Sequence, residues 1–285
     1  MKLRSLLFVP ADRPERFAKA AASGADAIIL DIEDSVALSQ KAIAREAVAA
    51  FLSGARPCPS FVRVNPLPSG MAGDDLAAIL PYRPDAIVFP KAEGANSIAT
   101  LDNMMRDILG AGAGGALPPI LPIATETPAA MFELGSYRHV AGRLIGLTWG
   151  AEDLPAAMGA VTGRDVHGRF TPPVEMARSL CLFGAHAAAV AAIETVYPQF
   201  SDREGLAAYL SRARRDGFTG SLAIHPAQVA AINAAFSPNA EEIAHAREIV
   251  SAFAANPDAG TLQIGGRMVD APHLKAAQAL LARAG

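Results

Sequence analysis

The chain has 285 residues, of which 51% are hydrophobic and 19% are charged, and its formal net charge is −3. This composition excludes a disordered chain, and the absence of a basic run argues against nucleic acid as a partner. No apolar stretch approaches about 18 uninterrupted residues, so we expect no membrane span. Two cysteines do not suggest a disulfide framework, and the first apolar run is too short for a signal peptide. We therefore expect a globular, cytoplasmic protein.

Apolar runs of strand length recur along the chain and alternate with Ala-rich segments of helical spacing. The runs are continuously apolar, which is typical of strands covered on both faces. They span 5–11, 26–33, 60–65, 85–91, 119–126, 143–150, 191–197 and 221–226. The helical segments between them span 14–24, 38–53, 72–80, 94–109, 127–135, 174–190 and 201–216. This alternation predicts a TIM (β/α)₈ barrel, with an open doubly wound sheet as the alternative.

The sequence after the eighth apolar run exceeds what a plain barrel requires. It contains a closing helix, a second helix, a hairpin signal at a Gly-Gly pair and a last helix, at 227–236, about 240–255, 265–266 and roughly 271–284. We assign 1–238 to the barrel domain and 239–285 to a C-terminal extension. The extension is expected to pack over the barrel or to cap the active site of a neighbouring subunit.

The glycine-rich segment 110–115 looks like a phosphate-binding loop, but it follows a helix and precedes two prolines. We interpret it as a helix exit.

Polar side chains gather at the carboxyl ends of the predicted strands, and the amino ends carry no comparable set. Functional residues of a barrel lie at this end, so the asymmetry predicts an enzyme. The residues are Asp12, Arg13, Asp31, Glu33, Asp34, Arg63, Asn65, Lys91, Glu126, Glu152, Asp153 and His225.

Glu126 and Asp153 are the candidate metal ligands. Each follows an apolar run, and if those runs are neighbouring parallel strands the carboxylates emerge at the same end of the sheet. Hard oxygen ligands without histidine or cysteine suit Mg²⁺ better than zinc. The alternative is that both are acidic residues placed at helix starts, where they favour the helix dipole.

Eight motifs in order resemble the citrate lyase β-subunit-like group of the HpcH/HpaI aldolase superfamily. They are SLLFVPADRPERFAKA, LDIEDSV, VRVNP, FPKAE, ATETPAA, WGAEDL, IHPAQV and MVDAPH, and they cover residues 4 to about 282. The resemblance implies a TIM-like barrel, a trimer or hexamer, Mg²⁺, and carbon–carbon cleavage of a 3-hydroxyacyl-CoA thioester.

The resemblance also implies roles for individual residues. Glu126 and Asp153 correspond to the Mg²⁺ ligands, and Arg63 to the catalytic arginine. Asp270 corresponds to an acid/base that an adjacent subunit supplies in related lyases, a role that requires a raised pKa. Glu33 and Asp34 of the motif LDIEDSV resemble an acidic pair that lies near the water shell of the metal.

Two of these roles have structural alternatives. Arg63 can form a structural ion pair with Asp31 or Glu33, and Asp270 can cap the last helix.

The phosphates of CoA require cations near the barrel mouth. Arg13 and Lys19, with Arg16 as a weaker candidate, follow the first strand, and His225 follows the eighth. For Lys91 a surface or CoA-phosphate role is favoured over a Schiff-base lysine. The backbone amides of Gly150, Ala151 and Glu152 are candidates for binding the carboxylate of a 2-oxo acid at a helix start.

We therefore expect a Mg²⁺-dependent lyase that cleaves citramalyl-CoA, malyl-CoA or citryl-CoA. The alternatives are thioester hydrolysis or condensation at the same site, a β subunit acting on a carrier-bound thioester, and a catalytically silent barrel. The sequence does not choose among substrates, because one methyl group is discriminated by loop shape.

Overall fold

The computed structural model describes residues 1–110 and 117–284, so most of the glycine-rich segment 110–115 lies outside the described residues. The chain divides into two compact units, Met1–Ala235 and Phe236–Gly285. No helix within the described ranges is long and apolar enough to cross a membrane.

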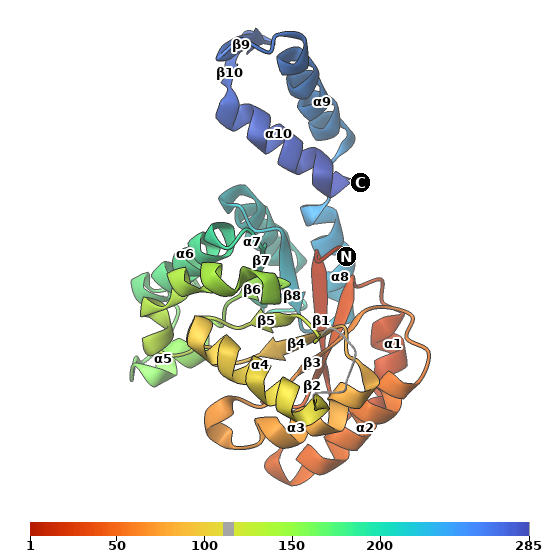
Figure 1. Ribbon diagram of the computed structural model, residues 1–285. Helices are drawn as coiled ribbons and strands as arrows, with labels where there is room; N and C mark the ends of the chain where they lie inside the picture. Colours follow the sequence, from red (N-terminus) through yellow and green to blue (C-terminus); the bar gives the residue numbers. More distant parts are fainter. Residues whose placement is uncertain (111–116, 285) are drawn as a thin grey trace. The chain divides into compact units, whose positions relative to one another are not determined.

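The first unit is built on eight parallel strands (Figure 1). They are β1 (Ser5–Pro10), β2 (Ala27–Asp31), β3 (Ser60–Arg63), β4 (Ala86–Phe89), β5 (Ile120–Pro122), β6 (Gly146–Thr148), β7 (Ala191–Glu194) and β8 (Gly220–Ala223). Their order in the sheet is β5-β4-β3-β2-β1-β8-β7-β6.

Strands β5 and β6, at the two ends of this order, meet and close the sheet. Parallel bridges join Ile120 to Leu144 and Ile123 to Thr148. The backbone N–H of Ala124 donates to the Thr148 carbonyl at 2.9 Å. The predicted (β/α)₈ barrel is therefore confirmed, and the open doubly wound sheet is excluded.

The barrel interior is filled by apolar side chains at alternate strand positions, because residues two apart point to the same face of a strand. The buried cluster comprises Leu6, Ala27, Ile29, Phe61, Ala86, Val88, Leu121, Ile123, Ile193 and Leu222. Since this core occupies the middle of the barrel, the side chains that follow each strand are left at the mouth.

The α-helices labelled in Figure 1 connect the strands, together with short 3₁₀ segments. The α-helices are α1 (Phe17–Ala21), α2 (Lys41–Ser53), α3 (Ala72–Ile79), α4 (Ala95–Leu109), α5 (Asp153–Ala157), α6 (Pro172–Ala187), α7 (Arg203–Asp216) and α8 (Pro226–Phe236). The 3₁₀ segments are η1 (Pro14–Arg16), η2 (Leu38–Gln40), η3 (Leu67–Ser69), η4 (Leu80–Tyr82), η5 (Ala129–Phe132) and η6 (Leu134–Arg143).

The predicted helix at 127–135 is not a single α-helix, because η5 and η6 take its place. Gly135 and Gly142 lie inside η6, and glycine weakens an α-helix by about 1 kcal/mol relative to alanine. The short 3₁₀ turns satisfy the backbone where a regular helix is disfavoured.

The second unit contains α9 (Ala240–Ala255), the hairpin of β9 (Thr261–Ile264) and β10 (Arg267–Asp270), and α10 (Ala271–Ala284). Asn239 and Glu242 form a capping box at the start of α9. Gly265 and Gly266 both have positive φ, 54° and 77°, which the tight hairpin turn requires. This unit has an apolar core of its own, formed by Ala246, Ile249, Ile264, Val269 and Ala277.

Candidate active site

Glu126 follows β5 and is 4% exposed. Its Oε2 accepts a hydrogen bond from the backbone N–H of Lys91 at 2.6 Å. Burial raises the pKa of Glu126 to about 8; the hydrogen bond from Lys91 opposes this shift and the charge of Asp153 adds to it. A cation bound beside this side chain would favour its ionised form.

Asp153 is the first residue of α5, which follows β6. Its side chain is 33% exposed, and Oδ1 lies 3.2 Å from the ammonium of Lys91. Lys91 contacts both carboxylates, because its backbone N–H donates to Glu126 and its ammonium pairs with Asp153. The structure therefore brings the two predicted metal ligands to the same end of adjacent strands.

Gly150, Ala151 and Glu152 form the segment between β6 and α5. A Cβ at Gly150 would lie 2.8 Å from Cγ and 3.0 Å from Oε1 of Glu126, so only glycine leaves room for that carboxylate. The backbone of Gly150 is tied to Thr125: its N–H donates to the Thr125 hydroxyl at 3.2 Å. Substrate binding by these three amides stays a prediction.

Arg63 ends β3, and its guanidinium makes a two-pronged contact with Asp31. Nε and Nη2 donate to the two carboxylate oxygens, each at 2.7 Å. Nη1 lies 2.9 Å from Oε2 of Glu33, and the guanidinium carbon lies 4.8 Å from the centroid of the Phe8 ring. Burial opposes the charge, but Asp31 outweighs it and raises the pKa of Arg63 above its ordinary value. The ion pairs considered from the sequence are present, and the guanidinium is permanently charged.

Glu33 and Asp34 follow β2. Glu33 is 3% exposed, whereas Asp34 is exposed. Burial raises the pKa of Glu33, against the charge of Arg63, and the charge of Asp34 adds to the rise. Among the described residues, Oε2 of Glu33 accepts no hydrogen bond. Its charge partner is the Arg63 guanidinium, whose Nη1 lies 2.9 Å away, so Glu33 is held at the barrel mouth by an ion pair.

Lys91, for which the sequence favoured a surface or CoA-phosphate role, belongs to this cluster and is partly buried. Its ammonium donates to Oε1 of Glu33 at 2.9 Å while also contacting Asp153. Burial lowers the pKa of Lys91, but the hydrogen bond and charge of Glu33 raise it above its ordinary value overall. The one feature of the sequence that indicated this place for Lys91 is its position just after a strand, β4, which the other residues of the cluster share.

Lys41, which the sequence analysis did not single out, supports the segment after β2. Its ammonium is buried and donates to the backbone carbonyls of Ile32 and Glu33 at 2.6 and 2.7 Å. These bonds fix the backbone from which the Glu33 side chain projects.

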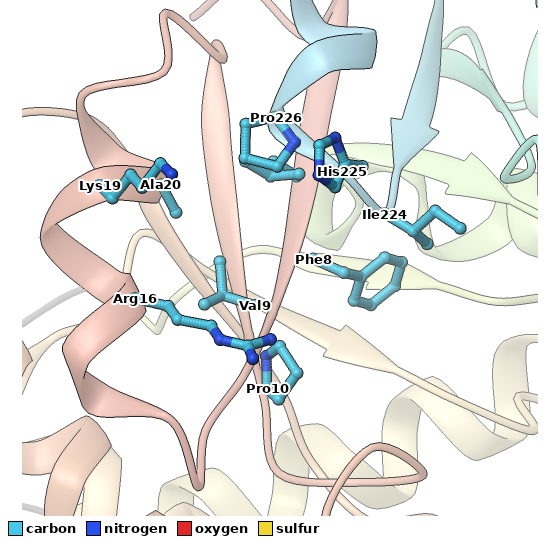
Figure 2. A pocket seen from close by; sticks show the side chains of 10 residues that line it. Phe8, Val9, Pro10, Arg16, Lys19, Ala20, Ile224, His225 and Pro226 are labelled. Atoms are coloured by element: carbon cyan, nitrogen blue, oxygen red, sulfur yellow. The ribbon is translucent and has the colours of Figure 1, made fainter. Parts of the chain in front are cut away.

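A pocket of about 380 Å³ lies between the start of α1 and the end of β8 (Figure 2). Lys19, Arg16 and His225 line it together with Leu7, Phe8, Val9, Pro10, Ala20, Ile224 and Pro226. The structure therefore brings Lys19 and His225 into one pocket, with Arg16 beside them. Arg13 does not line this pocket; its side chain is 57% exposed and lies 3.9 Å from Asp12. The His225 ring stacks on Phe200 at 4.8 Å between centroids.

Asp270 lies in the second unit, at the end of β10. Its Oδ1 is 2.5 Å from Nδ1 of His273, and this contact holds the pKa of the carboxyl below its usual range. Within a single chain, then, Asp270 does not have the raised pKa expected of a general acid.

The residues at the barrel mouth fit a hard divalent cation. Across the described ranges, no set of three or more His, Cys, Asp and Glu side chains is arranged to hold a metal. The predicted donors remain the pair Glu126 and Asp153, and Mg²⁺ is commonly bound by one or two carboxylates, with water or substrate completing its shell.

Comparison with known proteins agrees with this geometry. The chain is 35% identical over 281 residues to a citrate lyase subunit beta-like protein of Mycobacterium tuberculosis, covering 98% of this chain and 94% of the relative. It is 32% identical over 289 residues to a (3S)-malyl-CoA thioesterase of Cereibacter sphaeroides, covering 99% and 94%. A solved structure of the CitE protein from Mycobacterium tuberculosis, in complex with magnesium, acetoacetate and coenzyme A, superposes with a TM-score of 0.81 at 33% identity, covering 100% and 98% of the two chains.

The family model described as HpcH/HpaI aldolase/citrate lyase matches residues 4–226, which spans the whole barrel. These findings confirm the predicted family and the prediction of a lyase. The chain belongs to the HpcH/HpaI aldolase/citrate lyase family.

Proposed function

We propose that the chain is a Mg²⁺-dependent lyase that cleaves a short 3-hydroxyacyl-CoA thioester into acetyl-CoA and a 2-oxo acid. Citramalyl-CoA, malyl-CoA and citryl-CoA are the candidate substrates. The observation that carries this proposal is the pairing of the buried Glu126 with Asp153 at the ends of adjacent strands, beside the cation Lys91. Glu33 contacts both Lys91 and Arg63 and so links this pair to the proposed catalytic arginine. The magnesium and coenzyme A bound by the similar CitE protein support it.

Glu126 and Asp153 would hold the metal. When bound, Mg²⁺ supplies a Lewis acid for the oxo and carboxylate oxygens of the 2-oxo acid, worth several kcal/mol of charge stabilisation. The buried Glu126 is suited to this role because a cation compensates the free energy that burial adds to its ionised form. With only two protein carboxylates, ligand positions stay open to substrate.

The reaction breaks the C2–C3 bond of the substrate, and the electron pair of that bond remains on C2 as the enolate of acetyl-CoA. The C3 hydroxyl gives its proton to solvent water, and one proton is delivered to C2, so protons balance over the reaction. Arg63 is the group proposed to stabilise the enolate oxygen, because its guanidinium is permanently charged and fixed in direction by Asp31. Asp31 takes two of the five N–H donors and Nη1 also faces Glu33, so the N–H groups that remain on Nη1 and Nη2 would serve the substrate.

Asp270 is the proposed proton donor to C2, supplied by a neighbouring subunit. This role requires burial that the exposed carboxyl lacks within its own unit. Docking against a neighbour's barrel mouth supplies that burial, which is why the proposal includes a homo-oligomer.

CoA is proposed to occupy the pocket lined by Lys19, Arg16 and His225 (Figure 2). The two cations suit phosphates, and the apolar lining suits the less polar parts of the molecule. Arg13, on the exposed loop next to the pocket, is proposed as a further phosphate contact.

Hydrolysis of the thioester is the second candidate, favoured by the similarity to a (3S)-malyl-CoA thioesterase. The third is a subunit that acts on a carrier-bound thioester, favoured by the citrate lyase β-like relative. Each predicts different products, or a different form of the substrate, for the isolated protein.

Mass spectrometry of the products from the three CoA thioesters, with Mg²⁺ and with chelator, tests the proposal. We expect acetyl-CoA and a 2-oxo acid in equal amounts, formed only with the metal. Formation of free CoA and the intact hydroxy acid would show that the protein hydrolyses the thioester and does not cleave the C2–C3 bond. Turnover of carrier-bound substrate alone would establish the third candidate, and equal lysis in chelator would contradict the metal's role. Glu126→Gln removes one proposed ligand at nearly constant shape, and we expect it to lose the metal-dependent activity.

A further inference from the structure

Lys91 directs both of its nitrogens at acidic side chains of the barrel mouth. It follows β4 in the left-handed backbone region, with φ of 51°, which is uncommon for a residue other than glycine. Its backbone N–H donates to Glu126, and its ammonium contacts both Glu33 and Asp153. Such backbone conformations persist where the surrounding contacts fix them, and they cluster at functional sites.

The ammonium is placed where it acts on the proposed metal ligands. Arg63, the other cation of the cluster, pairs with Asp31 and Glu33. Among the described residues, Lys91 is the cation that contacts Asp153, at 3.2 Å from Oδ1. Any divalent ion held by Asp153 and Glu126 therefore lies close to a fixed positive charge and shares a carboxylate with it.

We propose that Lys91 sets the affinity of the site for its divalent cation. This inference rests on the proposed metal site. The ammonium repels the incoming ion and competes with it for Asp153, so Lys91 makes binding weaker than the two carboxylates alone would allow. The hydrogen bond from the ammonium to Glu33, which is not a proposed ligand, keeps the ammonium in the cluster when the ion is bound. The result is a metal ion that exchanges readily and leaves positive charge for the substrate.

The test is the dissociation constant of Mn²⁺, measured from the electron paramagnetic resonance signal of the free ion. Lys91→Met removes the charge and keeps a long unbranched side chain. Both residues must adopt the same left-handed backbone conformation at this position. Because the side chain of Lys91 is 28% exposed and therefore partly screened, we expect a dissociation constant about tenfold lower in this variant. Lys91→Arg keeps the charge and should stay within about twofold of the parent.

Lys2→Met is the matched control, because it removes an exposed lysine near the amino end of β1, away from the carboxyl ends of the strands. It should leave the dissociation constant unchanged. If Lys91→Met does not fold, Lys91→Gln removes the same charge with a polar side chain, and the same outcomes apply.

An unchanged dissociation constant in the neutral variant overturns the proposal. A higher one also overturns it, because Lys91 would then organise Asp153 for the metal rather than compete with it. Failure of the parent protein to bind Mn²⁺ overturns the metal site itself, and with it this inference. If the parent binds Mn²⁺ and Lys91→Met binds it with the same affinity, only the role of Lys91 is overturned and the metal site stands.

Discussion

At the scale of single residues, the barrel mouth is organised by buried carboxylates and the cations that face them. Burying a charge costs free energy unless a partner compensates it. Asp31 has such a partner in Arg63, whose charge, with its hydrogen bonds, outweighs the burial penalty and holds the pKa of the carboxyl below its usual range. Glu126 does not have enough compensation, and its pKa rises to about 8. The uncompensated residue is the one assigned to the metal.

The raised pKa of Glu126 predicts a pH dependence of stability in the metal-free protein. The folded state holds a proton on Glu126 up to about pH 8, whereas the unfolded chain releases it near the ordinary value of 4.5. Stability from this group is therefore lost as pH rises from 4.5 to 8, by up to about 4–5 kcal/mol. Glu126→Gln cannot titrate and lacks this loss.

Denaturant unfolding of both proteins in chelator, at pH 5.5 and 8.5, measures the difference. The variant should gain stability relative to the parent at the higher pH. Parallel pH profiles would show that Glu126 is ionised and compensated without a metal.

At the scale of secondary structure elements, the seam where β5 meets β6 positions both proposed ligands. The seam is held by backbone bridges and by the Thr125–Gly150 hydrogen bond. Gly150 lies against Glu126 so closely that even a methyl group has no space. The glycine therefore serves the carboxylate and not a turn, because its φ is not positive.

Gly150→Ala should displace the Glu126 side chain and weaken Mn²⁺ binding by about tenfold or more, since misplacing one of two ligands removes much of the site. Gly142→Ala, in η6, is the matched control because open space surrounds the position of its Cβ. Calorimetric titration of both variants with Mn²⁺ gives the comparison. Equal affinities would show that Glu126 is not a ligand, or that it moves without consequence.

The elements show what the sequence could predict and what it could not. Eight apolar runs sufficed for the barrel, because strands covered on both faces must be continuously apolar. The proximity of Glu126 and Asp153 followed from placing both at the ends of neighbouring parallel strands. The 3₁₀ segments in place of the helix at 127–135 were missed, since helical spacing of apolar residues does not separate α from 3₁₀ turns over so short a length.

Sequence reasoning placed Lys91 at the barrel mouth but did not foresee the side chains that it contacts. Its ammonium contacts Glu33 and Asp153, which lie 58 and 62 positions away in the chain, so no local sequence pattern predicts these contacts. The left-handed backbone that allows this reach occurs at a lysine, where sequence gives no reason to expect it. Arg63 was different, because Asp31 was already a candidate partner from the strand-end positions.

At the scale of the whole molecule, the proposed machinery is divided between two compact units. The barrel carries Glu126, Asp153 and Arg63, and the second unit carries Asp270. We expect Asp270→Asn to lose nearly all turnover, because general acid–base groups contribute about 10²–10⁴ in rate, while its Mn²⁺ affinity stays at the parental value. Steady-state kinetics and metal titration of one preparation check both parts. Equal activity would remove Asp270 from the mechanism.

The proposed sharing of Asp270 between subunits predicts complementation. Co-expressed Asp270→Asn and Glu126→Gln chains form some sites with an intact barrel from one chain and an intact Asp270 from the other. Random assembly in equal amounts should restore about a quarter of parental activity, because each of the two contributions is intact half of the time. Rates of the co-purified mixture, set against each variant alone, give the answer. No recovery would place Asp270 and the metal site in the same subunit.

The pairing of Glu126 and Asp153 around one ion is tested most directly by anomalous diffraction from crystals soaked in Mn²⁺. The account predicts a single strong peak at the barrel mouth, about 2.1 Å from one oxygen of each carboxylate, the length of magnesium–oxygen bonds. A peak bound elsewhere, or by only one of the two carboxylates, would contradict it.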